Sequence, residues 1–194
     1  MNTQAPMQRA LGDQWARLPE VLQRHFQSAA HRDMGTLDIE YPRFMQAPLY
    51  LLDWLGALLR RGGIAVPTTV EKHMDGERQH WRRTLYFPDG HEARFDSVWT
   101  YAGGNRIIEY VNPFLGLCMA VRTDGECLSY EGVYFIFRVG RWQLRIPEGL
   151  LLGHTSIRER PLHDGAFAMD FRLTHPWLGQ VYRYAGAFRT TLEE

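Results

Sequence analysis

The residues of this chain that could carry chemistry are scattered rather than gathered in one motif. Its 194 residues include eight histidines and two cysteines. The sequence has no His-Glu-x-x-His, Cys-x-x-Cys or Gly-x-Ser-x-Gly motif and no glycine-rich phosphate loop. We therefore predict neither a metal site nor a cofactor. The acids or bases that we consider for a cofactor-independent enzyme are His80, His175 and Glu109.

A basic pair, His80 and Arg82, lies in a stretch that is rich in aromatic and hydroxyl side chains. Burying an arginine costs free energy unless a partner offsets its charge. If Arg82 faces the interior, it therefore meets either a carboxylate of the protein or an anionic ligand. His175 lies in the last hairpin loop next to Pro176 and Trp177. We consider two roles for it there, either as an acid or base carried by the loop or as a ring that packs on the tryptophan.

Turn positions predict which of these side chains share a face of a sheet. We take Asp89-Gly90 and Gly103-Gly104 as two-residue turns, which places Arg82 opposite Ser97 and Ser97 opposite Tyr110. We predict that this face lines the interior and that Arg82, Tyr110 and Tyr184 bind the polar end of a ligand. The full set of candidate ligand-binding residues is Arg82, Glu109, Tyr110, Tyr184, Trp99, His80 and His175.

The elements that would position these residues are mostly strands. From Pro67 onward the chain alternates apolar and polar residues between turn signals such as Asp75-Gly76 and Asp164-Gly165, which indicates about nine antiparallel strands. No helical pattern separates them, which excludes parallel βαβ units and a Rossmann site. We predict a mainly β (α+β) fold, in which a long antiparallel meander forms a barrel or a strongly curved sheet.

The first third of the chain is expected to form a helical layer. Apolar residues recur from Met7 to Phe26 at helical spacing, and Pro19 divides this stretch into two pieces. A second helix is expected over residues 48–61, apolar nearly all round and hence buried, and a short strand over residues 35–41. We treat residues 1–194 as one domain, with residues 1–63 mostly helical and residues 64–194 forming the sheet or barrel.

Composition narrows the class of function. Hydrophobic residues make up 45% and charged residues 23% of the chain, and the formal net charge is zero, so no overall field attracts nucleic acid. Lys72 is the only lysine, which indicates either oxyanion contacts by the arginines or codon bias. With no signal peptide and no apolar run long enough to span a membrane, we expect a cytoplasmic location. Cys118 and Cys127 are expected to be free thiols, since hairpin pairing keeps them apart.

The order of several segments resembles the bacterial domain of unknown function 4166 family. They are Leu11–Trp15, Leu18-Pro19, Gly76–Arg83, Ile108–Pro113, Arg145–Pro147, Asp164–Phe171 and Leu178–Gly186. Positions similar to residues shared by that family are Trp81, Arg82, Glu109, Pro147, Tyr184 and Gly186. Family members are found attached to saccharopine-dehydrogenase-like domains, so the resemblance implies a ligand-presenting role and an association with a dehydrogenase-like partner.

Three functions stay open at the level of sequence. The first is binding of a small hydrophobic or amphipathic molecule in the concave interior of the sheet. The second is a cofactor-independent isomerase, cyclase or hydrolase. The third is a protein-interaction module that docks through a sheet edge or through the loop around Trp177. A closed, filled core would favour the third, whereas an open, polar-lined cavity in which the pKa of a carboxylate or histidine is strongly shifted would favour the second.

Overall fold

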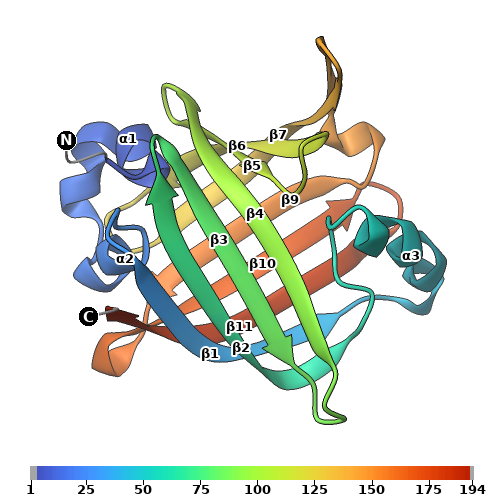
Figure 1. The fold of residues 1–194 in the computed structure, drawn as a ribbon, viewed down its shortest axis with the longest axis horizontal. Coiled ribbons are helices and arrows are strands. Elements are labelled where there is room, and N and C mark those ends of the chain that lie inside the picture. Colours follow the sequence, from blue (N-terminus) through green and yellow to red (C-terminus); the bar gives the residue numbers. More distant parts are fainter. Residues whose placement is uncertain (1–3, 193–194) are drawn as a thin grey trace.

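The main structural unit is a closed antiparallel β-barrel. The computed structural model describes residues 4–192, which contain an eleven-stranded sheet in the order β6-β5-β4-β3-β2-β1-β11-β10-β9-β7-β8. Strand β6 also pairs with β7, and this contact closes ten strands into a barrel (Figure 1). The predicted mainly β fold with a barrel and amino-terminal helices is therefore confirmed.

The elements follow the chain in a simple order. The helices are α1 (Pro6–Leu11), η1 (Gly12–Arg17), α2 (Glu20–His25), η2 (Arg43–Met45), α3 (Gln46–Trp54), η3 (Glu148–Leu150) and η4 (His163–Gly165). The strands are β1 (His31–Glu40), β2 (Gly63–Asp75), β3 (Arg78–Tyr86), β4 (Glu92–Gly103), β5 (Arg106–Tyr110), β6 (Leu115–Thr123), β7 (Leu128–Val139), β8 (Trp142–Pro147), β9 (His154–Pro161), β10 (Ala166–His175) and β11 (Gly179–Leu192).

Strand β7 pairs with β6 along one edge and changes its partner halfway along the other edge. Its first residues, 128–131, pair with β9, whereas residues 134–139 pair with β8. The hairpin of β7 and β8 therefore extends beyond the barrel, at the top right of Figure 1. Gly132 lies at the division, and a Cβ atom there would be 1.8 Å from a carboxylate oxygen of Glu148. A larger residue at this position would displace the Glu148 side chain.

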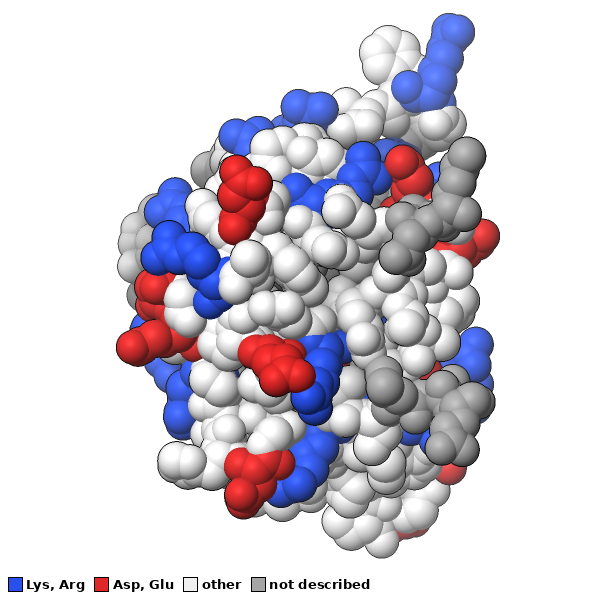
Figure 2. Space-filling model, turned by 90° about the vertical axis from the view of Figure 1, so that its left-hand side faces the viewer, with Lys and Arg blue, Asp and Glu red and all other residues white. Residues whose placement is uncertain are grey.

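The amino-terminal helices cover one end of the barrel (Figure 1). The expected break near Pro19 is confirmed, because η1 ends at Arg17 and α2 begins at Glu20. The apolar side chains of Met7, Leu22 and Phe26 are fully buried. Figure 2 shows this end with basic and acidic side chains interspersed, which agrees with the net charge of zero.

Helix α3 lies at the opposite end of the barrel (Figure 1) and differs from its prediction. It ends at Trp54 rather than at residue 61, since Gly56 adopts a φ of 67° that terminates the helix. The prediction that it is buried all round is wrong, because Tyr50 and Trp54 are 59% and 79% exposed while Leu49 is fully buried. A helix that covers the end of a barrel presents only one face to the core.

Two further expectations concern the cysteines and the membrane. Cys118 lies opposite Tyr134 across β6 and β7, and both Cys118 and Cys127 are free, as predicted. Among residues 4–192, no helix is long and apolar enough to cross a membrane.

Candidate functional site

The connection between β3 and β4 decides which side chains face the barrel interior. The Phe87 amide donates to the His91 carbonyl and the Gly90 amide to the Phe87 carbonyl, so the loop has three residues rather than two. Arg82 consequently lies opposite Asp96 and not opposite Ser97. A shift of one residue reverses the faces of a strand. The prediction that Arg82 faces the interior is wrong, and its side chain is 59% exposed on the outside.

The candidate residues therefore divide between two faces. Tyr110 lies opposite Val98 and belongs to the outer face with His80, so its predicted interior position is also wrong. Trp99 and Glu109 lie opposite each other and face the interior. Tyr184 also faces the interior. His175 joins neither group, because its ring packs against Trp177 with centroids 5.4 Å apart and its Nδ1 accepts from the Trp177 amide.

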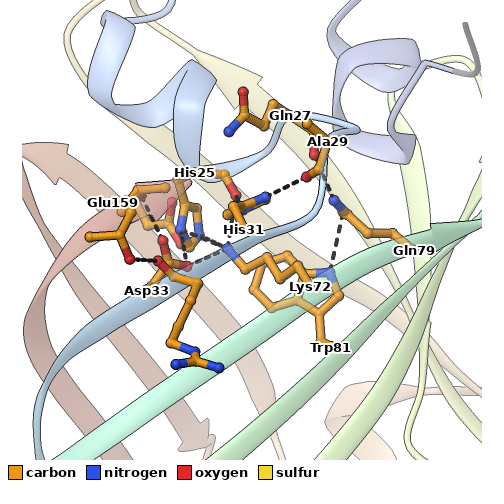
Figure 3. Close-up of polar contacts among 12 residues, drawn as sticks. His25, Gln27, Ala29, His31, Asp33, Lys72, Gln79, Trp81 and Glu159 are labelled. Atoms are coloured by element: carbon orange, nitrogen blue, oxygen red, sulfur yellow. Dashed lines mark hydrogen bonds and ion pairs between the residues drawn. The ribbon is translucent and has the colours of Figure 1, made fainter. Parts of the chain in front are cut away.

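The barrel interior contains a buried charge cluster formed by His25, Asp33, Lys72 and Glu159 (Figure 3). Lys72 Nζ lies 2.5 Å from Asp33 Oδ2 and donates to the His25 carbonyl oxygen at 2.8 Å. His25 Nδ1 lies 2.8 Å from Asp33 Oδ2, and His25 Nε2 lies 3.6 Å from Glu159 Oε1. The Lys72 ammonium is also 3.9 Å from the centroid of the Trp81 ring, a cation–π contact.

Strand alternation explains how the sequence brings this buried charge cluster together. In β2 the inward row is Val66, Thr68, Val70 and Lys72. In β1 it runs from Ile39 and Leu37 back to Asp33 and His31, and His31 pairs with Lys72 in register. Glu159 continues the inward row of β9, and His25 is the last residue of α2. Each member thus occupies the position where the apolar pattern would place a hydrophobic residue.

The charges in the cluster shift one another's protonation. Burial would raise the pKa of Asp33, but the charges of Lys72 and His25 and their hydrogen bonds outweigh it and hold that pKa well below its usual range. Burial lowers the pKa of Lys72 to about 8, although Asp33 opposes the shift. Burial, with the charge of Glu159, raises the pKa of Tyr130 well above its usual value. A lysine that titrates near neutral pH is typical of functional sites.

A second interior ion pair lies beside the buried charge cluster. Arg83 donates to Ser97 Oγ at 2.9 Å and to Glu109 Oε1 at 3.1 Å, and both charged side chains are nearly buried. Sequence analysis predicted Arg82 as the interior arginine, whereas in the structure the interior arginine is its neighbour Arg83. The ring of Tyr184 lies in the same region, and burial raises its pKa.

Three small cavities adjoin these charged groups. One of about 40 Å³ lies beside His25, Asp33 and Glu159; one of about 60 Å³ is lined by apolar residues such as Leu117 and Phe135; and one of about 20 Å³ lies beside Arg83. Tyr184 borders all three. Buried polar groups normally have hydrogen-bond partners, yet within the described part of the chain Trp99 Nε1, the Tyr130 hydroxyl and Glu159 Oε2 complete no well-formed hydrogen bond.

The outer candidates line a groove of about 500 Å³ on the outside of β2 to β5, with Arg138 of β7 at its side. Arg82, His80 and Tyr110 all belong to it. The structure therefore brings together two sets of predicted residues rather than one. Among residues 4–192, no group of three or more His, Cys, Asp or Glu side chains is arranged to hold a metal ion.

Sequence reasoning missed His25, Asp33, Lys72, Arg83 and Glu159 as interior residues. Two signals for them were present. Lys72 is the only lysine and continues the alternating row of Val66, Thr68 and Val70. Asp33 likewise continues the row of Leu37 and Ile39.

These observations define the protein as an antiparallel β-barrel, capped by helices, with a buried charge cluster and small interior cavities. The chain belongs to the family described as domain of unknown function (DUF4166), which matches residues 18–188. Of the positions that carry the resemblance, Gly186 has a clear structural reason, since a Cβ atom there would lie 1.9 Å from the Thr36 carbonyl oxygen. The family match confirms the resemblance but says nothing of a dehydrogenase-like partner, which stays a prediction.

Comparisons with other proteins add no function. No curated protein matches the chain. A putative thioesterase II from Thermobifida fusca YX is 11% identical, with 84% of this chain and 79% of that chain covered and a TM-score of 0.29. The dehydratase domain of RzxB from Pseudomonas fluorescens is 10% identical, with 83% and 76% covered and a TM-score of 0.18. We draw no conclusion from likenesses this weak.

Proposed function

We propose that the barrel binds a small amphipathic molecule in its interior, next to the buried charge cluster. The observation that carries this proposal is the set of Trp99, Tyr130 and Glu159, whose buried polar atoms border a cavity. Within residues 4–192, Trp99 Nε1 has no hydrogen-bond partner, and the Tyr130 hydroxyl has only a poorly formed contact with Glu159. A ligand with a donor for Glu159 and an acceptor for Trp99 Nε1 would satisfy them. The apolar part of the ligand would occupy the neighbouring cavity beside Leu117 and Phe135.

The energetic balance supports a ligand-binding role for the buried charge cluster. A buried ion pair rarely stabilises a protein more than apolar residues of the same volume would. Placing Lys72, Asp33, His25 and Glu159 inside the barrel therefore costs desolvation without a comparable gain in stability. The three cavities together admit a molecule of only a few heavy atoms, so a larger ligand would require α3 and the residues that follow it to move.

The first test is to identify what the interior holds. Native mass spectrometry of the protein purified from its own host, followed by organic extraction, is expected to find a small molecule in stoichiometric amount. If the protein is empty, thermal-shift measurements with short fatty acids and aromatic acids follow. An empty protein whose melting temperature none of these compounds changes would contradict the proposal.

The second test uses Tyr130→Phe, which removes only the buried hydroxyl. Since that hydroxyl has only a poorly formed contact with Glu159, its loss is expected to leave the melting temperature nearly unchanged. Affinity for the extracted molecule should fall by roughly tenfold, the effect of about one hydrogen bond. Tyr86→Phe, at a tyrosine that is 41% exposed, is the matched control. Equal affinities in the two variants would show that Tyr130 does not contact the ligand.

A second candidate is an acid–base enzyme acting on the same interior ligand. The pKa of about 8 for Lys72 favours it, because a group that titrates near neutral pH transfers protons efficiently. His25, between Asp33 and Glu159, would be the neighbouring acid or base. Incubating the extracted compound with the protein and analysing it by mass spectrometry distinguishes turnover from binding.

A further inference from the structure

The groove on the outside of the barrel has the size of a ligand site. Its volume of about 500 Å³ falls within the usual range for small-molecule pockets, whereas the interior cavities measure about 60, 40 and 20 Å³. It is formed by side chains of β2, β3, β4, β5 and β7 together with the loop that follows β5. Rigid strands therefore hold most of its lining in place.

Three guanidinium groups line this groove with little neutralising charge around them. Within the described residues, neither Arg78 nor Arg138 has a carboxylate within ion-pair distance. Arg82 has one carboxylate contact, 3.8 Å from Glu71, and Glu71 already lies 2.7 Å from Arg32. Arg61, elsewhere on the surface, is by contrast closely paired and lies 2.6 Å from Asp89. The groove thus retains positive charge that is available to a ligand.

The floor of the groove offers flat surfaces for stacking. The rings of His73 and His80 are parallel to within 10°, with centroids 5.0 Å apart. His80 lies in register with Val98, and Val98 with Tyr110, so the imidazole and the phenol belong to one cross-strand row. Arg138 lies 4.4 Å from the centroid of the Tyr110 ring and donates to the Tyr110 hydroxyl at 2.5 Å.

The positive charge is concentrated at one end of this row. Burial raises the pKa of Tyr110, and the charges of Arg138 and Arg78 oppose that rise, so both guanidinium groups act on the phenol oxygen. Glu71 and Asp96, the acidic residues that line the groove, lie in the cross-strand row of Arg82. Asp75 lies opposite Arg78 and 4.0 Å from His80, but its side chain is 81% exposed and does not line the groove. An anion would therefore approach Arg78 and Arg138 rather than Arg82.

We propose that this groove is a second binding site, separate from the interior, for a small planar organic anion. The oxyanion, a phosphate or a carboxylate, lies between Arg78 and Arg138, where guanidinium groups donate charge-assisted hydrogen bonds. The planar ring of the ligand lies beside His80 and the edge of Tyr110, whose face the Arg138 guanidinium covers.

Isothermal titration calorimetry tests the proposal with four probes: phenyl phosphate, benzoate, phenol and inorganic phosphate. An aryl oxyanion is expected to bind more tightly than phenol or inorganic phosphate, because it alone makes both kinds of contact. Tighter binding of phenyl phosphate indicates a phosphate ligand, and tighter binding of benzoate a carboxylate. Failure of both aryl anions to bind would overturn the proposal.

Substitutions locate the binding. In Arg78→Gln/Arg138→Gln the affinity for the tighter aryl anion is expected to fall by about tenfold or more, since two charge-assisted contacts are lost. Arg94→Gln/Arg160→Gln removes the same two charges from β4 and β9, at exposed arginines that do not line the groove, and should leave the affinity unchanged. Tyr130→Phe should also have no effect, which separates this site from the interior. Unchanged affinity in the double variant would overturn the proposal.

Discussion

The buried charge cluster and the outer groove use the same kinds of residue in opposite ways. Both combine basic side chains, carboxylates and aromatic rings on neighbouring strands. Inside, Lys72 lies 2.5 Å from Asp33 and packs on the Trp81 ring with no exposed surface. Outside, Arg82 is 59% exposed, and its nearest carboxylate contact is 3.8 Å away.

The surroundings of a charged side chain, rather than its residue type, determine how its charge affects stability and binding. Removing one member of a buried pair leaves the other charged in a poorly solvated interior, whereas an exposed charge that loses its partner is solvated by water. The interior charges are therefore coupled to folding, while those of the groove are available for binding. We therefore expect charges inside and outside the barrel to differ in how much they change the free energy of unfolding. We also expect their contributions to change with pH in opposite directions.

The greatest loss of stability is expected from Asp33→Asn, which removes the anion opposite Lys72. The free energy of unfolding should fall by about 3–5 kcal/mol, because Lys72 would remain buried without its carboxylate partner. Glu71→Gln is the matched change on the outer face, where it removes the carboxylate beside Arg82, and should alter the free energy of unfolding by no more than about 1 kcal/mol. Urea unfolding of both variants measures the two values.

The Lys72→Met/Asp33→Asn double variant controls for a simple packing defect. If loss of charge balance causes the destabilisation by Asp33→Asn, removing the Lys72 charge as well should recover part of the lost stability. An Asp33→Asn protein as stable as Glu71→Gln would show that the interior and outer charges do not differ in this way.

The comparison also shows how much the sequence could predict. Alternation and Asp-Gly turns were sufficient for an antiparallel barrel with helices at its amino-terminal end, because these signals are local. The three-residue loop at Pro88–Gly90 also contains Asp-Gly, so composition did not reveal its extra residue. That one residue moved Arg82 to the outer face and Arg83 to the interior.

The buried charge cluster could not be assembled from the sequence for a different reason. Its members come from α2, β1, β2 and β9, and only closure of the barrel brings them together. Asp33, Lys72 and Glu159 each lie where an inward row of a strand would otherwise continue with an apolar residue. In the sequence, each of them therefore interrupts the alternation that predicts the strand. Trp99, Glu109 and Tyr184 were placed among the candidates, but their charged neighbours Lys72 and Arg83 were not.

A smaller effect is expected in the response of stability to alkaline pH. Lys72 has a pKa of about 8 in the folded protein and 10.5 as its ordinary value, so between these values the unfolded chain binds more protons. The contribution of this pKa shift to the free energy of unfolding is complete above pH 10.5 and is lost as pH falls through about 8. The free energy of unfolding should therefore rise by up to about 1.4 kcal/mol per pH unit in this window. Urea unfolding from pH 7.5 to 9.5 measures the slope.

Lys72→Met provides the reference for that slope. It retains every other titrating group, including both cysteines, so subtracting its profile isolates the contribution of Lys72. If the two profiles run parallel, Lys72 does not titrate in this window, and the second candidate function loses its main support.

The smallest effect should have the opposite sign and should come from His154, which is half exposed outside the barrel. Its Nε2 lies 2.8 Å from Glu131 Oε2, and its Nδ1 contacts Glu148. Burial works to lower the pKa of His154, but hydrogen bonds to these carboxylates and their charges outweigh it and raise that pKa above 6.5. The folded protein thus binds the proton more tightly, so the stabilisation is complete below pH 6.5 and is lost as pH rises through the folded pKa.

Comparison of the wild type with His154→Gln between pH 6.5 and 8 measures this loss. The difference in free energy of unfolding between the wild type and His154→Gln should shrink as pH rises. The difference between the wild type and His163→Gln, a change at an exposed histidine, should stay constant. A wild-type advantage that grows with pH would show that the surface carboxylates do not hold the His154 proton. The pKa shifts of Lys72 and His154 have opposite signs because their surroundings differ. At Lys72, desolvation lowers the pKa more than the charge of Asp33 raises it, whereas at half-exposed His154 two carboxylates raise the pKa more than desolvation lowers it.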